Sequence, residues 1–289
     1  MNHKKDHTEG IWIGQSRLID TDLKPVGKFV ESEGESYYLI SNFRSMPDFF
    51  ISIVSDSDHW MFISSNGALT AGRKNRNNAL FPYYTDDKIH DYRDKTGSKS
   101  YFLVEKENKF FLWEPFTDEF GKFYSITSNL YKSIFGNKII FEEINHDLGL
   151  SFRYSWNNSE KFGFVKKSQL TNTGENPIKV KLLDGLLNIL PAGVDFGFQN
   201  ELSNLLDAYK KNELVDGTTL GLFSLSSIPV DKAEPSESLK TTTVWSTGLQ
   251  EKCKILLSEK QIAKFTSGGP IEQEHDVRAS RGTYFIHSE

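Results

Sequence analysis

The chain has 289 residues, of which 37% are hydrophobic and 13% aromatic, and its formal net charge is -5. This length suits one large β domain or two ordinary domains, and the 22 phenylalanines supply enough apolar surface for a core. The acidic balance and the scattered basic residues exclude the clustered Lys and Arg of a nucleic-acid-binding surface. We therefore expect no nucleic-acid partner.

Cysteine content and hydropathy narrow the class of protein further. Cys253 is the single cysteine, so an intrachain disulfide and a cysteine-based zinc site are both excluded. We expect it at a half-buried strand position. Residues 1–10 are polar, and no apolar run approaches the roughly 18 residues of a membrane span. These patterns predict a cytoplasmic protein without a membrane partner.

Short apolar or alternating runs separated by turn residues dominate the chain, which is typical of an all-β antiparallel fold. Thirteen strands are predicted, at 37–41, 49–54, 60–64, 101–105, 110–114, 138–143, 148–154, 162–171, 178–187, 220–227, 241–245, 252–257 and 283–287. Lys179 and Lys181 alternate with Val180 and Leu182, which predicts one face in water and one in the core. Tryptophans in strands are usually core residues, and we expect this of Trp113.

Two connecting segments carry signals of their own. Residues 172–177 place Asn, Gly and Pro where a hairpin loop needs positive φ and a strand stop, so we predict a β-hairpin of the flanking strands. Apolar residues at 198, 202, 205, 206 and 209 share one helical face, which predicts one amphipathic helix over 198–211. Asn200 and Glu201 would lie near its start as caps.

Residues 64–88 are the most informative segment for function. They combine two arginines, several amide and carboxylate side chains, and a Phe-Pro-Tyr-Tyr run without a clear strand or helix period. An irregular segment of this length inside a domain is typical of a binding or lid loop, and its aromatic residues argue against disorder. Flat rings beside hydrogen-bonding groups suit a sugar, which has an apolar face and a rim of hydroxyls.

The segment supplies the candidate substrate-binding residues. We predict that Arg73 and Asp86 bond sugar hydroxyls and that Tyr83 or Tyr84 stacks on a sugar ring. A plain surface ion pair between Arg73 and Asp86 is the alternative. Two further candidates follow directly in the sequence, Asp87 and His90.

No catalytic residue, metal ligand or cofactor is predicted. Glycoside cleavage needs two carboxylates flanking the bond, but acidic residues are so abundant here that no pair stands out. Mutarotase chemistry would need a histidine and a carboxylate in one cleft, for which His90 is the best of the internal histidines. The chain has no HxH or HExxH spacing and no glycine turn followed by a phosphate-binding lysine.

Short motifs, taken in their order, carry a family resemblance. DFFIS at 48–52 precedes the Gly-rich segment, and LWEPF at 112–116 and the NTG run at 172–174 follow it. This order is similar to that of the N-terminal domain of the cellobiose and chitobiose phosphorylase family. The resemblance covers about residues 36 to 260, and segment 184–240 departs from the family pattern.

The resemblance implies a large antiparallel β-supersandwich, similar to galactose mutarotase, with one or a few short helices. Residues 1–35 would be an N-terminal extension or first strands, and 36–289 the carbohydrate-associated domain. In that family a catalytic (α/α) barrel follows, so this chain would be a non-catalytic domain that binds a sugar or oligosaccharide, contacts the missing barrel and contributes to a homodimer. A stand-alone mutarotase-type epimerase and a structural or interaction domain without a ligand are the alternatives.

Overall fold

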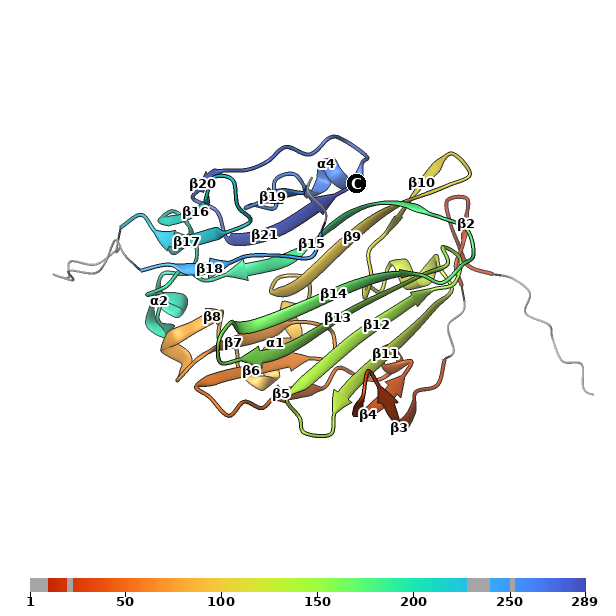
Figure 1. Ribbon diagram of the computed structural model, residues 1–289, viewed down its shortest axis with the longest axis horizontal. Helices are drawn as coiled ribbons and strands as arrows, with labels where there is room; N and C mark the ends of the chain where they lie inside the picture. The colour runs from red at the N-terminus through yellow and green to blue at the C-terminus, as the bar shows by residue number, and fades with distance from the viewer. Residues whose placement is uncertain (1–9, 20–22, 228–239, 250–252) are drawn as a thin grey trace, which may run out of the picture.

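The protein is an all-β antiparallel fold with a few short helices, as predicted. The computed structural model describes residues 10–19, 23–227, 240–249 and 253–289 (Figure 1). Within these ranges every strand pair is antiparallel, and the α-helices contain four to six residues. The helices are α1 (Asp86–Ile89), α2 (Phe196–Glu201), α3 (Ser203–Asp207) and α4 (Ile262–Thr266). In the same ranges no helix is long and apolar enough to cross a membrane.

Two sheets contain the long strands. The six-stranded sheet has the order β14 (Gly163–Asn172), β13 (Leu150–Ser159), β12 (Lys138–Asn145), β11 (Ile126–Ser133), β4 (Glu35–Ser41) and β3 (Val26–Ser32). The five-stranded sheet has the order β10 (Lys109–Trp113), β9 (Gly97–Lys106), β15 (Lys179–Ile189), β21 (Gly282–Ser288) and β19 (Lys254–Leu256).

Two four-stranded sheets and a small hairpin complete the structure. One sheet has the order β5 (Phe50–Ile53), β6 (His59–Ser64), β7 (Leu69–Arg73) and β8 (Ala79–Phe81). The other has the order β18 (Thr242–Val244), β17 (Gly221–Leu225), β16 (Lys210–Leu214) and β20 (Asp276–Arg278). The hairpin consists of β1 (Trp12–Ile13) and β2 (Ser16–Arg17).

The four larger sheets surround a common centre like the blades of a four-bladed β-propeller (Figure 1). The expected supersandwich is not the arrangement seen. The β5–β8 sheet is made of four consecutive strands, whereas the five-stranded sheet draws its strands from distant parts of the chain. The prediction of an all-β fold is thus confirmed at the level of fold class.

One hydrophobic cluster occupies the centre and takes side chains from all four sheets. Each sheet contributes at least one side chain that is at most 2% exposed, and examples are Met61, Phe102, Phe152 and Phe223. Trp113 is fully buried in the same cluster, as predicted. A second cluster lies on the other side of the five-stranded sheet, beneath α4.

Each of the thirteen predicted ranges overlaps an observed strand. The alternation in β15 is also confirmed, because Val180 and Leu182 pack against the central cluster. Cys253 is half-buried beside that cluster and immediately precedes β19. The strands absent from the prediction are β1, β2, β3, β7, β8, β11, β16 and β20.

The predicted hairpin at 172–177 is wrong, although its turn chemistry is present. The Asn172 side chain accepts a hydrogen bond from Gly174 N (2.9 Å) and donates one to Asn176 O (2.7 Å). However, β14 pairs with β13, while β15 lies between β9 and β21 in another sheet. The turn residues reverse the chain locally but do not determine which sheet the next strand joins.

The predicted single helix over 198–211 is also wrong. Asp195 caps α2 by accepting a hydrogen bond from Phe198 N (2.8 Å), and the backbone of Leu202 separates α2 from α3. Asn200 and Glu201 therefore lie at the end of α2 and not at its start. Lys210 begins β16, whose side chains alternate between buried and half-buried, so strand pairing overrides the helical period there.

Segment 64–88 is not the irregular loop expected from its sequence. It contains β7, β8 and the short 3₁₀ helix η2 (Arg76–Asn78). Four of the five residues of β7 are buried. Because neither face of this strand is exposed, its sequence does not alternate between apolar and polar residues, and the strand could not be recognised from that alternation.

Candidate functional site

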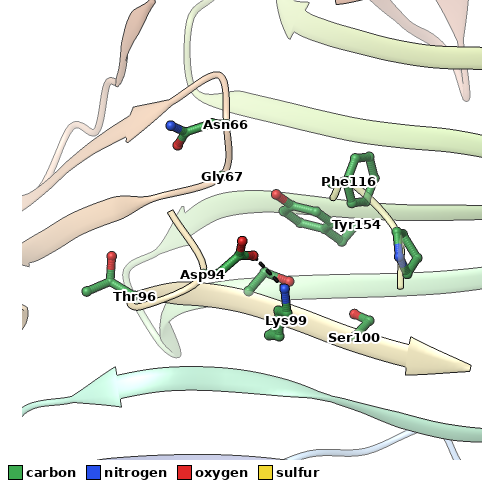
Figure 2. Close-up of a pocket in the computed structure, with 10 residues that line it drawn as sticks. Asn66, Gly67, Asp94, Thr96, Lys99, Ser100, Phe116 and Tyr154 are labelled. Carbon is green, nitrogen blue, oxygen red and sulfur yellow. Dashed lines mark hydrogen bonds and ion pairs between the residues drawn. The ribbon is translucent and has the colours of Figure 1, made fainter. Parts of the chain in front are cut away.

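A small polar recess lies where three sheets meet (Figure 2). Its walls come from the β6–β7 turn, the start of β9 with the residues before it, the segment after β10, and β13. The lining residues are Asn66, Gly67, Asp94, Thr96, Ser98, Lys99, Ser100, Pro115, Phe116 and Tyr154. Its cavity volume is about 20 Å³, which is room for one water-sized group.

Tyr154 places a hydroxyl at this recess. Its side chain is only 3% exposed, because the ring stacks on Phe141 (centroids 4.9 Å apart) and meets the edge of Phe116. Figure 2 shows the hydroxyl pointing toward the Asn66–Gly67 turn. Burial and the nearby carboxylates raise the pKa of Tyr154, so the phenol keeps its proton. In the described part of the chain, Tyr154 Oη makes no hydrogen bond to a protein group.

Two lysines at and near the recess are paired with carboxylates. Lys99 is 6% exposed and forms ion pairs with Asp94 and Glu114. Lys166 of β14 pairs with Asp184 of β15 (2.8 Å), an ion pair that joins the six-stranded and five-stranded sheets. Because each ammonium has at least one carboxylate partner, these lysines stabilise the junction of the sheets and leave no unpaired positive charge.

A second feature is a row of five aromatic rings, which we call the aromatic row. In order it contains Phe50, Phe62, Trp60, Tyr83 and Phe196. Successive ring centroids lie 5.2, 5.9, 5.7 and 5.6 Å apart. The planes of Phe50 and Phe62 differ by 32°, and those of Phe62 and Trp60 by 33°. Phe50 is 41% exposed and the other four rings are half-buried, so the row reaches solvent.

The strand period and one close backbone contact produce the aromatic row. Trp60 and Phe62 project from β6 on the face opposite Met61 and Ile63, which enter the core. Trp60 lies over Gly72 of β7, where an added Cβ would be 2.5 Å from its ring. The indole Nε1 donates a hydrogen bond to Asn75 O (3.3 Å), which fixes the ring.

The exposed turn that leads from the last residue of β7 to β8 contacts two rings of the row, Trp60 and Phe196. We call residues 73–78 the polar turn, since it holds two arginines, a lysine and three asparagines, all exposed. The Arg76 guanidinium lies 4.2 Å from the centre of the Phe196 ring. Asn77 accepts a hydrogen bond from Phe196 N (3.4 Å). Rings and planar hydrogen-bonding groups thus share one surface.

Arg73 has another acidic partner, and its pairing with Asp86 stays a prediction. Arg73 forms an ion pair with Asp58 (2.8 Å), and the hydrogen bond from Arg73 holds the pKa of Asp58 below its usual value. Asp86 and Asp87 form the first turn of α1, and their side chains lie outside the described set.

The other predicted residues have different surroundings. Tyr83 belongs to the aromatic row, and its backbone N donates to Gln199 Oε1 (2.9 Å). Tyr84 stacks on Tyr92 with ring centroids 3.4 Å apart, so one of its faces is already covered. Burial and Tyr92 raise the pKa of Tyr84. His90 Nδ1 is 2.8 Å from Ser64 Oγ, and Ser64 ends β6 just before the turn that borders the recess.

The aromatic row was only partly visible in the sequence. From the sequence, Trp60 could stack on a sugar, although a tryptophan in a strand is more often a core residue. Phe50 and Phe62 carry no predicted role, because residues 60–63 are apolar at every position, as in a fully buried strand. The feature of the sequence that could have identified the row is the alternation in β6, where Trp60 and Phe62 share one face and Met61 and Ile63 share the other.

The two most buried glutamates have structural partners. Glu143 accepts hydrogen bonds from Trp113 Nε1 (2.8 Å), Phe116 N (2.8 Å) and Arg44 (3.1 Å), and burial raises its pKa. Glu142, on the opposite face of β12, binds the side chains of Asn129, Tyr131 and Arg153. In the described ranges, no three His, Cys, Asp or Glu side chains are grouped so that they could hold a metal ion.

Comparison with known proteins gave no match, either to a protein-family model or to a curated protein sequence.

Proposed function

We propose that the chain is a non-catalytic carbohydrate-binding domain of a protein that resembles glycoside phosphorylases and hydrolases. The aromatic row and the polar turn form its sugar-facing surface. In such a protein the surface would face the sugar site of an (α/α)-barrel domain. The observation that carries the proposal is the half-exposed row of rings beside exposed Arg and Asn side chains.

The physical basis is the two-sided chemistry of a sugar ring. Its apolar face packs on an aromatic side chain, and its hydroxyl rim needs planar donors and acceptors at the edge of the stack. Phe50, Phe62 and Trp60 supply successive rings of similar tilt. Arg76 and the asparagines of the polar turn supply the hydrogen-bonding groups. An extended oligosaccharide suits a row of this kind better than a single sugar.

The partners of the buried carboxylates support a non-catalytic role. A glycosidase acid must reach the glycosidic oxygen, with a second carboxylate across the bond. Glu142 and Glu143 instead lie on opposite faces of one strand and bind protein groups. Release of glucose or glucose 1-phosphate from cellobiose by the purified chain, lost in a single Asp or Glu variant, would overturn this part of the proposal.

Oligosaccharide titration followed by NMR of the tryptophan indole signals tests the surface. We expect a dissociation constant of about 1 mM, since a shallow surface lacks the enclosure that gives small ligands high affinity. The Trp60 indole signal should shift, and Trp60→Ala should weaken binding about tenfold or more. Trp245→Ala is the matched control, because Trp245 is 48% exposed but lies outside the row.

The opposite pattern would favour a structural or interaction domain without a sugar ligand. Shifts confined to residues outside the aromatic row and the polar turn would contradict the proposal. So would an affinity that stays unchanged in both Trp60→Ala and Arg76→Ala.

A further inference from the structure

We propose that the recess at Gly67, Asp94 and Tyr154 is a second binding site, and that it takes one neutral hydroxyl group of a polyol or sugar. It shares no residue with the aromatic row. The inference is therefore independent of the sugar-facing surface proposed above.

The unpartnered Tyr154 hydroxyl points to a ligand. The Tyr154 ring is buried, but its oxygen has no protein partner among the described residues and opens on the recess, so a hydrogen-bonding group placed there can pair with it. Tyr131, two strands away in the same sheet, shows the usual case, since its Oη donates to Glu142 (2.7 Å). The Tyr154 hydroxyl instead faces the open recess (Figure 2). Nearby, Ser98 Oγ is buried without a partner among the described residues.

The charges around the recess select a neutral ligand. The Lys99 ammonium disfavours a cation, and the carboxylates of Asp94 and Glu114 disfavour an anion. A hydroxyl both accepts and donates hydrogen bonds. It can accept one from Tyr154 Oη and donate one to Asp94, whose side chain is 48% exposed.

The size of the recess limits the ligand to one functional group. A volume of about 20 Å³ holds a hydroxyl but not a sugar ring. Gly67 keeps this space open, because a Cβ there would be 3.3 Å from Tyr154 Oη. The bound molecule must therefore insert a single alcohol group and leave its body outside.

Titration of the full chain with glycerol and with methyl β-glucoside, followed by amide NMR, tests the site. We expect saturable shifts at Gly67, Asp94 and Ser98. Tyr154→Phe should weaken them at least tenfold without lowering the melting temperature, because no protein hydrogen bond is lost. Tyr131→Phe is the control: it should leave polyol binding unchanged but lower the melting temperature, since it removes the bond to Glu142.

A second variant keeps the test decisive. Asp94→Asn should also weaken polyol binding while the Tyr154 ring stays in place. Shifts that never saturate, or that persist unchanged in Tyr154→Phe and Asp94→Asn, would show that the recess holds only water and would overturn the proposal. The Trp60 indole signal reports separately on the aromatic row, so the two proposals can fail independently.

Discussion

Lys132 of β11 is a half-buried ammonium whose bonding partner is neutral. It donates to the backbone carbonyl of Ser52, and burial lowers its pKa to about 8. Because this is below the value of about 10.4 for an unfolded lysine, the folded state binds its proton more weakly. The free energy of unfolding should therefore rise between about pH 8 and pH 10.4, and the penalty of the charged form is fully present below pH 8.

We predict that Lys132→Met stabilises the protein by about 1 kcal/mol at pH 7, a value reduced for partial exposure to solvent. The gain should shrink as the pH approaches 10, and urea unfolding at pH 7 and pH 9.5 measures it. Lys138→Met is the control, because Lys138 pairs with Glu35 (2.7 Å) and its pKa is raised. A variant less stable than the native protein at pH 7 would show that the Ser52 bond outweighs the desolvation cost.

Gly72 in β7 determines whether the hairpin of β7 and β8 can close beneath Trp60. A Cβ at this position would lie 2.5 Å from Asn78 O and 2.7 Å from Ala79 Cα, both backbone atoms that cannot rotate away. We predict that Gly72→Ala destabilises the protein by about 1–3 kcal/mol, the usual cost of overpacking. It should also shift the Trp60 indole signal, because the ring rests on this glycine.

Gly121→Ala, in the 3₁₀ helix η4 (Phe120–Lys122), is the control for Gly72→Ala. In the described ranges, a Cβ added at Gly121 would have no atom within 4 Å apart from those of its own helix and chain neighbours. Its stability should stay within about 0.5 kcal/mol of the native protein, as is usual for surface substitutions. Equal effects of the two substitutions in chemical denaturation would show that backbone crowding at Gly72 is relieved at little cost.

Strand existence could be predicted from the sequence, whereas strand partners could not. Period-2 alternation marks β13 and β15 because one strand face differs from the other. It fails at β7, where both faces are covered, and the turn at 172–177 gives no information on sheet membership.

At the candidate site, Tyr83 was predicted because it lies among polar residues. The recess depends on tertiary packing of Gly67, Asp94 and Tyr154, which no local pattern encodes.

The shared core predicts that the whole described fold unfolds in one step. Phe152 is 2% exposed and contacts Phe102 of the five-stranded sheet, with ring centroids 5.0 Å apart. We predict that Phe152→Ala costs about 3–5 kcal/mol and lowers the stability of every sheet together. Hydrogen exchange should then show equal losses of protection in β6, β9 and β17. A loss confined to the six-stranded sheet would contradict a single cooperative unit.

The interleaved five-stranded sheet has a consequence for synthesis on the ribosome. β15 needs β9 on one side and β21 on the other, and Gly185 pairs with Phe285 in the completed sheet. A nascent chain that has just emerged past β15 thus exposes one edge of a long apolar strand until β21 has been translated. Such edges invite pairing with other chains, and distant strand partners slow folding. Yield in cells should therefore depend on translation rate and on chaperones that shield β15 during this interval.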